Sequence, residues 1–188
     1  MASASNAAQP GHPGRWVMMG VSGCGKSTIG AALAHHFDVP FLEGDAFHPA
    51  DNVAKMSAGT PLDDTDRAGW LQVLAAEIRQ ARDKGTGLVL SCSALKRHYR
   101  DLLRQADPEL RFVHLNGPRV LISDRMQARV GHYMPPSLLD SQLSILEPLQ
   151  SDEAGVTLDI ALPPQLLIER ITESTGRTGS APTNVASS

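Results

Sequence analysis

Short apolar runs alternate with longer segments in which apolar residues recur every three or four positions, between about residues 15 and 175. Continuous apolar runs are typical of strands buried in a parallel sheet, and the longer recurrence is typical of helices packed on its faces. We therefore predict an α/β fold with one five-stranded parallel sheet flanked by helices. The expected strands are residues 16–19, 39–42, 88–90, 112–115 and 156–160.

The helical stripes lie between these runs. Clear stripes are predicted at residues 29–37, 71–78 and 99–106, and a weaker helix at about 118–130. A Gly- and Pro-containing break at 131–136 separates the weaker helix from a further stripe at 139–146, and a last helix begins near Pro163 and Pro164. The break predicts a loop, which we expect to form a mobile lid over about residues 125–140.

Composition limits the domain organisation and the partners. At 188 residues with 41% hydrophobic residues, the chain has room for one well-buried core. We predict one domain over residues 15–175, with disordered tails at 1–14 and 176–188, which are small, polar and rich in Gly, Pro or Ser. A net charge of −3 argues against non-specific nucleic-acid binding.

Localisation follows from two further features. No segment approaches the roughly 20 apolar residues that span a bilayer, and the first residues lack the pattern of a signal peptide. The two cysteines lack metal-pair spacing and are too few for a disulfide framework, which favours a reducing compartment. We expect a cytoplasmic protein without a membrane partner.

The strongest motif follows the first expected strand. Residues 20–27 read Gly-Val-Ser-Gly-Cys-Gly-Lys-Ser, which matches the phosphate loop G-x-x-x-x-G-K-[ST] in its required place between a strand and a helix. Backbone N–H groups of such a loop surround phosphate oxygens, Lys26 reaches the β- and γ-phosphates, and the Ser27 hydroxyl ligates Mg²⁺. The predicted ATP-binding residues of this segment are Gly20, Ser22, Gly23, Cys24, Gly25, Lys26, Ser27 and Thr28.

An acidic residue follows the second expected strand. Asp45 and the nearby His48 lie there, and Ser93 follows the third strand. Because the carboxyl ends of parallel strands meet at one edge of a sheet, we expect Asp45 and Ser93 to flank the phosphate loop. Asp45 can accept the proton of an attacking hydroxyl or hold a water of the Mg²⁺ shell, or it can merely cap a turn, and the sequence leaves these roles open.

The class of phosphate-loop protein is narrowed by what the chain lacks. The sequence contains no Asn-Lys-x-Asp segment, the motif by which switch GTPases recognise guanine. It also has no Asp at the end of the third expected strand, where motor and transporter ATPases carry their second Mg²⁺ ligand. These absences argue against a switch GTPase and against a motor or transporter ATPase.

Several segments then resemble gluconokinase of the thermoresistant type. They are residues 20–28, Phe41–Pro49, Asn52–Met56, Gly59–Asp64 with Asp66-Arg67 and Trp70-Leu71, and Cys92–Lys96 with Tyr99-Arg100, together with Gly131–Pro135. The resemblance covers about residues 15–172. It implies a nucleoside-monophosphate-kinase-like fold, transfer of the γ-phosphoryl group of ATP to the 6-hydroxyl of D-gluconate, a requirement for Mg²⁺, and a homodimer.

Within that resemblance, the substrate indicates further site residues. Gluconate carries a carboxylate and several hydroxyls, so its pocket needs a cation and hydrogen-bond partners. Lys96, Arg97 and Arg100 are candidates for the cation, although each also fits a solvated helix face. His48 is a candidate for bonding a hydroxyl, and the resemblance adds His132 to the substrate-binding residues.

Two arginines precede the expected lid. Arg125 and Arg129 are one helical turn apart and can face one side. Their place resembles that of lid arginines in similar kinases, which stack on adenine or neutralise charge during transfer. We expect Arg125 to bind nucleotide and Arg129 to act in catalysis.

The phosphate loop also carries a cysteine. Cys24 lies beside Lys26 at a helix N-terminus, where positive charge favours the thiolate. We therefore expect oxidants to inhibit the protein through Cys24 or Cys92.

Two alternatives stay open at this stage. A kinase for another small acceptor, such as shikimate or adenylylsulfate, shares the phosphate loop and the acidic residue but not the His48-Pro49 segment. An ATP-binding regulatory module without turnover is the alternative from a different class of protein.

Overall fold

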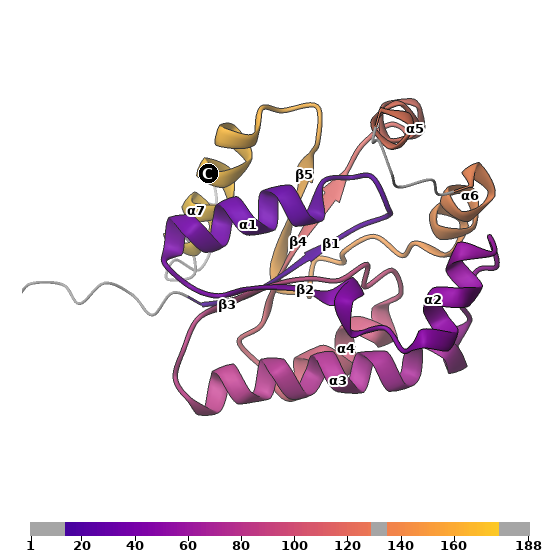
Figure 1. Ribbon diagram of the computed structural model, residues 1–188. Helices are drawn as coiled ribbons and strands as arrows, with labels where there is room; N and C mark the ends of the chain where they lie inside the picture. The colour runs from indigo at the N-terminus through magenta and orange to yellow at the C-terminus, as the bar shows by residue number, and fades with distance from the viewer. Residues whose placement is uncertain (1–13, 129–134, 177–188) are drawn as a thin grey trace, which may run out of the picture.

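A sheet of five parallel strands forms the centre of the fold (Figure 1). The computed structural model describes residues 14–128 and 135–176. The strand order is β2-β3-β1-β4-β5, and every pair of neighbours is parallel. The predicted α/β class is confirmed. The strands are β1 (Arg15–Met19), β2 (Phe41–Glu43), β3 (Leu88–Ser91), β4 (Arg111–Asn116) and β5 (Gly155–Asp159).

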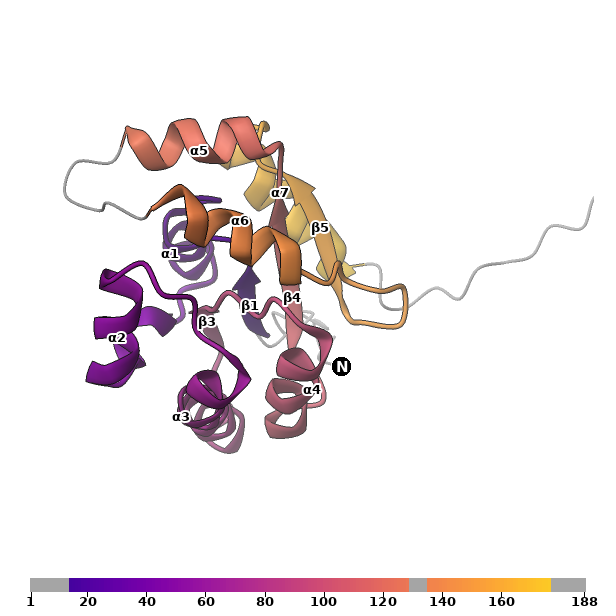
Figure 2. The same ribbon diagram turned by 90° about the vertical axis from the view of Figure 1, so that its right-hand side faces the viewer.

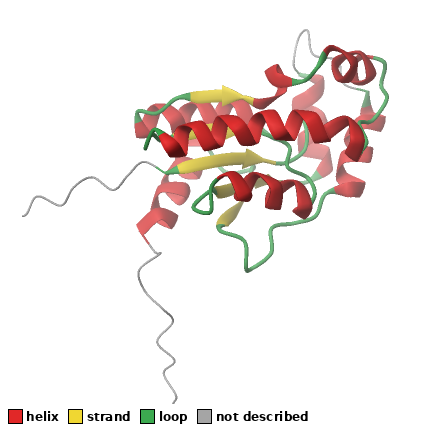
Figure 3. Ribbon diagram, turned by 90° about the horizontal axis from the view of Figure 1, so that it is seen from below, coloured by secondary structure: helices red, strands yellow, loops and turns green. Residues whose placement is uncertain are grey.

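Helices cover both faces of this sheet. One face carries α1 (Lys26–Phe37) and α7 (Pro164–Gly176), and the other carries α3 (Asp64–Asp83) and α4 (Arg97–Ala106) (Figures 1 and 3). Successive residues of β1 alternate between the two cores: Trp16 and Met18 pack on the α1 side, and Val17 and Met19 on the α3 side. Each of these side chains is at most 2% exposed, so β1 is the buried centre from which the phosphate loop departs.

The remaining elements surround the carboxyl edge of the sheet. They are the 3₁₀-helix η1 (Gly44–Phe47) and the helices α2 (Ala50–Ser57), α5 (Arg119–Gln127) and α6 (Pro136–Ile145). Figure 2 looks onto this edge, with α2, α5 and α6 around the strand ends. The sequence predicted α5 and α6 but missed η1 and α2, because residues 44–57 contain few apolar side chains and no clear helical stripe.

The second strand is shorter than predicted. The N–H of Val39 donates to the carbonyl oxygen of Ala34, which closes the end of α1, so the strand begins at Phe41 rather than at Val39.

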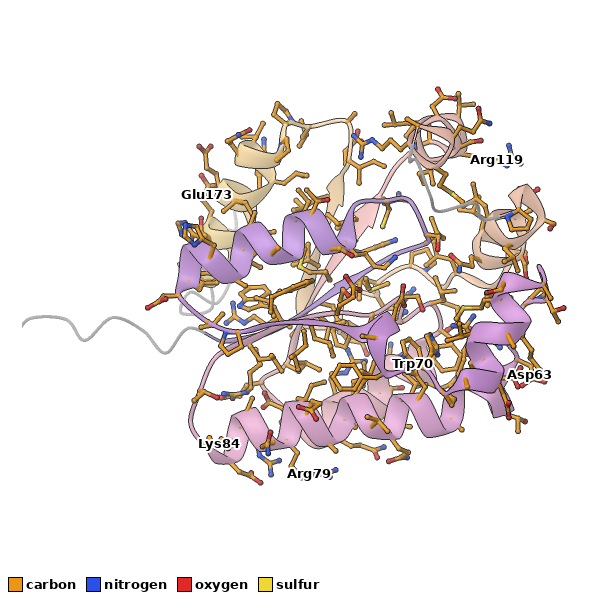
Figure 4. All side chains as sticks on the ribbon, in the orientation of Figure 1. Asp63, Trp70, Arg79, Lys84, Arg119 and Glu173 are labelled. Atoms are coloured by element: carbon orange, nitrogen blue, oxygen red, sulfur yellow. The ribbon has the colours of Figure 1, made fainter. Side chains whose placement is uncertain are left out.

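A capping box fixes the start of α3. The N–H of Asp66 donates to Asp63 Oδ1 over 2.8 Å, and the N–H of Asp63 donates back to Asp66 Oδ2 over 3.0 Å. A cap of this kind contributes about 1 kcal/mol of helix stability. It also sets the helical phase, so that Trp70 points from α3 toward the sheet and Arg79 points away from it (Figure 4).

Some sequence predictions fall outside the described residues. The predicted tails, 1–14 and 176–188, lie outside them except for Gly14 and Gly176, and so does the centre of the predicted lid, residues 129–134. Among the described residues, no helix combines the length and apolar character that a membrane span requires.

Candidate active site

The phosphate loop occupies residues 20–25, between β1 and α1. Gly25 precedes α1 with φ 98°, and no side chain caps the helix N-terminus. A residue with a Cβ is strained at this φ, which explains the glycine. The uncapped N–H groups of the first turn, which includes Ser27 and Thr28, are therefore available to an anion.

Two polar groups of the loop have partners within the protein. Lys26 Nζ donates to the carbonyl oxygen of Val21 over 2.9 Å. The N–H of Ser22 donates to Gln142 Oε1 over 2.7 Å, which joins α6 to the phosphate loop. A phosphate that binds these groups has to replace both contacts.

A cavity of about 350 Å³ lies beside the loop. Gly23, Cys24, Gly25 and Thr28 line one side, and Arg125 of α5 lines another. Arg125 Nη2 donates to the carbonyl oxygen of Ile160 over 2.8 Å, which holds the guanidinium at the cavity. Apolar side chains complete the wall, as is typical of pockets that bind a planar base. They are Ile29, Ala128, Ile160, Leu162, Pro164 and Leu167.

Asp45 lies in η1, where the chain turns sharply after β2. A Cβ on Gly44 would lie 2.0 Å from the carbonyl oxygen of Ser91, so only glycine lets η1 approach β3 this closely. The indole N–H of Trp70 in α3 donates to the carbonyl oxygen of Gly44 over 2.8 Å, which stabilises the turn. The turn leaves the Asp45 side chain 70% exposed at the carboxyl edge of the sheet.

His48 lies behind Asp45. Its side chain is 3% exposed, and its Nε2 is 3.9 Å from Asp45 Oδ1. Burial lowers the pKa of His48, and the charge of Arg67 acts in the same direction, while Asp45 opposes them. His48 is therefore mainly neutral at pH 7.

Three charges converge on the end of β3. Cys92 is buried there, and burial raises the pKa of its thiol to about 12. The charge of Asp45 raises the pKa of Cys92 further, while the charges of Lys26 and Arg67 lower it. All three side chains therefore act electrostatically on the Cys92 thiol. That Asp45 flanks the phosphate loop stays a prediction from the order of the strands.

The predicted oxidation sensitivity does not fit the geometry. Cys24 and Cys92 are each 1% exposed. Oxidants act on accessible thiolates, whereas Cys92 is a buried thiol and Cys24 faces the protein interior. The expectation from sequence took the positive charge near Cys24 into account but not its burial.

Arg67 is a candidate site residue that the sequence reasoning missed. It is 5% exposed, and its guanidinium makes only two long hydrogen bonds, of 3.4 Å each, to Leu62 O and Ser93 Oγ. Among the described residues, no carboxylate pairs with it. Arg67 also lines a small cavity of about 20 Å³ together with Gln142. The signal in the sequence was a charged residue one turn before Leu71 on the buried stripe of α3.

Arg100 was expected to bind the substrate, and this prediction is wrong. Its side chain has no exposed surface, and its guanidinium forms an ion pair with Glu153 through contacts of 2.7 and 2.8 Å. It also donates to the carbonyl oxygens of Ala94 and Leu95. Ala94 has φ 43°, a conformation rare for a residue other than glycine, so Arg100 braces the strained loop after β3.

Lys96 and Arg97 already have carboxylate partners. Lys96 Nζ is 2.8 Å from Asp64 Oδ1, and Arg97 makes two contacts of 2.8 and 2.7 Å with Asp152. Both pairs are exposed, in agreement with the solvated-face alternative. Neither is a free cation, whereas Arg67 is buried without an acidic partner in the described part of the chain.

The described part of the chain offers few side chains that could bind a metal ion. Among residues 14–128 and 135–176, no group of three or more His, Cys, Asp or Glu side chains could hold an ion. This fits Mg²⁺ that arrives with a nucleotide, because such an ion takes one or two protein oxygens and completes its shell with phosphates and water. Ser27 and Asp45 are the predicted oxygens. Arg129 and His132 lie outside the described residues.

Known proteins resemble the chain in sequence. Residues 16–149 match the AAA domain family. A gluconokinase of Gluconobacter oxydans is 46% identical over 155 residues, which cover 82% of this chain and 87% of the relative. The thermoresistant gluconokinase of Escherichia coli is 44% identical over 151 residues, covering 79% and 85%.

Solved structures resemble it as well. A gluconokinase from Sinorhizobium meliloti superimposes with a TM-score of 0.80 at 43% identity, covering 88% of this chain and 93% of that one. A sugar kinase from Janibacter in unliganded form gives a TM-score of 0.83 at 47% identity, covering 88% and 95%.

Proposed function

The chain belongs to the gluconokinase family, and from that premise we infer that it transfers the γ-phosphoryl group of ATP to gluconate. The observation that carries this inference is the meeting of two parts at one edge of the sheet. A phosphate loop with an uncapped helix N-terminus lies there, the N–H of Gly20 donates to the carbonyl oxygen of Ser93 over 3.2 Å, and Arg67 Nη1 lies 3.4 Å from Ser93 Oγ. Such an edge can hold a nucleotide and a charged acceptor together.

We propose that ATP lies with its phosphates on residues 20–28 and its base in the cavity beside Arg125. Lys26 would leave the Val21 carbonyl and reach the β- and γ-phosphates, where its charge stabilises the transferring group. Ser27, with Asp45 directly or through water, would hold Mg²⁺. The ion supplies charge neutralisation between the β- and γ-phosphates.

The acceptor would bind between η1 and α3. We propose that Arg67 binds the gluconate carboxylate or a neighbouring hydroxyl, because it is a buried cation with no acidic partner among the described residues. Asp45 would take the proton of the 6-hydroxyl as that oxygen forms a bond to the γ-phosphorus, while the bond from phosphorus to the β-phosphate oxygen breaks and ADP leaves. His48 would donate a hydrogen bond beside them.

Other roles stay proposals from the sequence and from the resemblance. They are catalysis by Arg129, substrate binding by His132, closure of the lid at about 125–140, a homodimer and a cytoplasmic location. An Arg129→Ala variant should lower kcat more than it weakens ATP binding, and an unchanged kcat would exclude that role.

The test of the function is ADP release from Mg²⁺-ATP with a panel of acceptors. The panel contains gluconate, shikimate, adenylylsulfate, other sugar acids, glucose, nucleoside monophosphates and no acceptor. Stimulation by gluconate alone, lost in Lys26→Met and Asp45→Asn variants, supports the proposal. Stimulation by another acceptor keeps the kinase and rejects gluconate, and bound ATP without any transfer indicates a regulatory module.

A further inference from the structure

A buried polar cluster lies behind Asp45. It joins His48, Asn52 of α2, and Asp66 and Trp70 of α3. Asn52 is 3% exposed, which is unusual for an asparagine on a short helix at the edge of the fold. A buried amide of this kind has to be hydrogen-bonded, and its partners show what it does.

The orientation of the Asn52 amide is fixed by one contact. Its Nδ2 lies 2.8 Å from the backbone carbonyl oxygen of Asp66. A carbonyl oxygen can only accept, so the atom in that place is the amide nitrogen and not the amide oxygen.

The same nitrogen settles where the proton of His48 lies. Asn52 Nδ2 is 3.4 Å from His48 Nδ1. The amide nitrogen has two protons to donate and no lone pair to accept with, so Nδ1 must be the accepting ring nitrogen. In a neutral imidazole the proton then lies on Nε2.

Stacking on Trp70 holds the plane of the imidazole ring. The imidazole stacks on the indole of Trp70 with centroids 4.1 Å apart and planes 17° apart, and the indole is held by its bond to the Gly44 carbonyl. The Nε2 atom of His48 therefore stays 3.9 Å from Asp45 Oδ1, on the side of the candidate acceptor site. The charged groups that act on this imidazole are Asp45 and Arg67.

We propose that Asn52 is a positioning residue that fixes His48 as the Nε2–H tautomer, so that His48 donates a hydrogen bond beside Asp45 and cannot accept the proton of the acceptor hydroxyl. Asp45 is then the group that takes this proton. The link to the acceptor rests on the proposed function, whereas the tautomer is a property of the free protein.

The tautomer is measured directly by long-range ¹H–¹⁵N correlation NMR of protein labelled at histidine, near pH 7.5. A His48→Gln variant assigns the signals of His48. Wild-type protein should show His48 protonated on Nε2, with an unprotonated Nδ1. A ring protonated on Nδ1, on both nitrogens, or in equal mixture would overturn the proposal without any reference to activity.

Two variants test the part played by Asn52. Asn52→Leu keeps the side-chain volume but removes the donor, and Val53→Ser on the exposed side of α2 is the matched control. Asn52→Leu should give a mixture of His48 tautomers and lower kcat about tenfold, with the KM for ATP unchanged. An unchanged tautomer and kcat in a folded Asn52→Leu protein would reject the role.

A second measurement covers the case in which Asn52→Leu does not fold. Asn52→Ser retains a short donor, and the wild-type spectrum alone still tests the tautomer. Failure of the proposed function has a different signature, because wild-type protein would then show the Nε2–H tautomer without any response to gluconate.

Discussion

The backbone N–H of Ser22 in the phosphate loop donates to the side-chain oxygen of Gln142 in α6 over 2.7 Å. The amide oxygen of Gln142 thus occupies a place where a phosphate oxygen would accept from the loop. This contact ties the nucleotide side of the site to the small cavity that Gln142 shares with Arg67. Nucleotide binding and the acceptor side are joined through one side chain.

A Gln142→Ala variant should bind ATP more tightly than wild type, because ATP no longer has to displace the amide oxygen. One hydrogen bond contributes about 0.5–1.5 kcal/mol net, so roughly a 2- to 12-fold gain in affinity is expected. Calorimetry with a non-hydrolysable ATP analogue measures it. Ser144→Ala, on the exposed side of α6, is the control. Weaker binding by Gln142→Ala would mean that the amide contacts the nucleotide instead.

Removal of the Arg67 charge should weaken the use of gluconate as acceptor without changing the affinity for ATP. Arg67→Met keeps an unbranched side chain but loses every donor, and a hydrogen bond to a charged group is worth about 1.5–3 kcal/mol. The kcat/KM for gluconate should therefore fall roughly 10- to 150-fold, while the affinity for ATP stays the same. Steady-state kinetics with both substrates measures this.

The control for that prediction lies on the same helix. Arg79→Met changes an arginine that points away from the sheet and should leave both constants unchanged (Figure 4). Equal effects of the two substitutions would reject the role of Arg67 in acceptor binding.

The fold could be predicted from sequence because its signals are local. The central strands β1 and β3 are largely apolar runs, and the phosphate-loop motif is defined by eight consecutive residues. The helices η1 and α2 could not be predicted, since residues 44–57 are held by contacts with distant parts of the chain. Gly44 packs against Ser91, and Asn52 bonds the backbone of Asp66.

The candidate site was predicted less completely for a related reason. Sequence position placed Lys26 and Asp45 at one edge of the sheet, but it gave no information on which arginine already has a partner. Arg100 forms a buried ion pair with Glu153, which is 53 residues away in the sequence, so its role is structural. Arg67, on the buried stripe of α3, has no such partner among the described residues. The difference between Arg67 and Arg100 is an ion pair with a residue distant in sequence, which sequence position alone does not reveal.

Arg100 should be essential for stability. Loss of one partner from a buried ion pair costs up to about 3–5 kcal/mol, and the contact of Arg104 with Glu153 over 2.9 Å compensates part of the charge that remains. Arg100→Met should lower the free energy of unfolding by this amount, measured by urea denaturation, whereas Arg97→Ala, in an exposed pair, should have little effect. The double variant Arg100→Met, Glu153→Gln should recover part of the loss. Full stability of Arg100→Met would contradict the bracing role.

The thiols should react only when the protein unfolds. Cys24 and Cys92 are buried and out of reach of a reagent, and burial raises the pKa of Cys92 to about 12, so Cys92 is a thiol at pH 8. A thiol reagent such as DTNB should label the native protein slowly and the urea-unfolded protein at once. Rapid labelling of native protein, with loss of activity, would restore the oxidation sensitivity that the sequence suggested.

The stability of the protein should fall as the pH drops from 6.5 toward 4. His114 of β4 is 2% exposed, and neither ring nitrogen has a hydrogen-bond partner among the described residues. Burial, assisted by the charge of Arg100, lowers the pKa of His114 to about 4. Between pH 6.5 and 4 the unfolded chain binds a proton at this imidazole and the folded chain does not, so protonation favours unfolding.

The size and the window of this effect make it measurable. Each pKa unit corresponds to about 1.4 kcal/mol, so the loss approaches roughly 3 kcal/mol near pH 4. Carboxylates contribute at lower pH: burial raises the pKa of Glu153, but bonds from Arg100, the Gln150 N–H and Arg104 outweigh it and hold the pKa at about 2. Urea denaturation across pH 4–8 should show a slope that His114→Leu largely removes, with the remainder due to His48 and, below about pH 5, to carboxylates such as Glu153. An identical slope in His114→Leu would assign the whole effect to other groups.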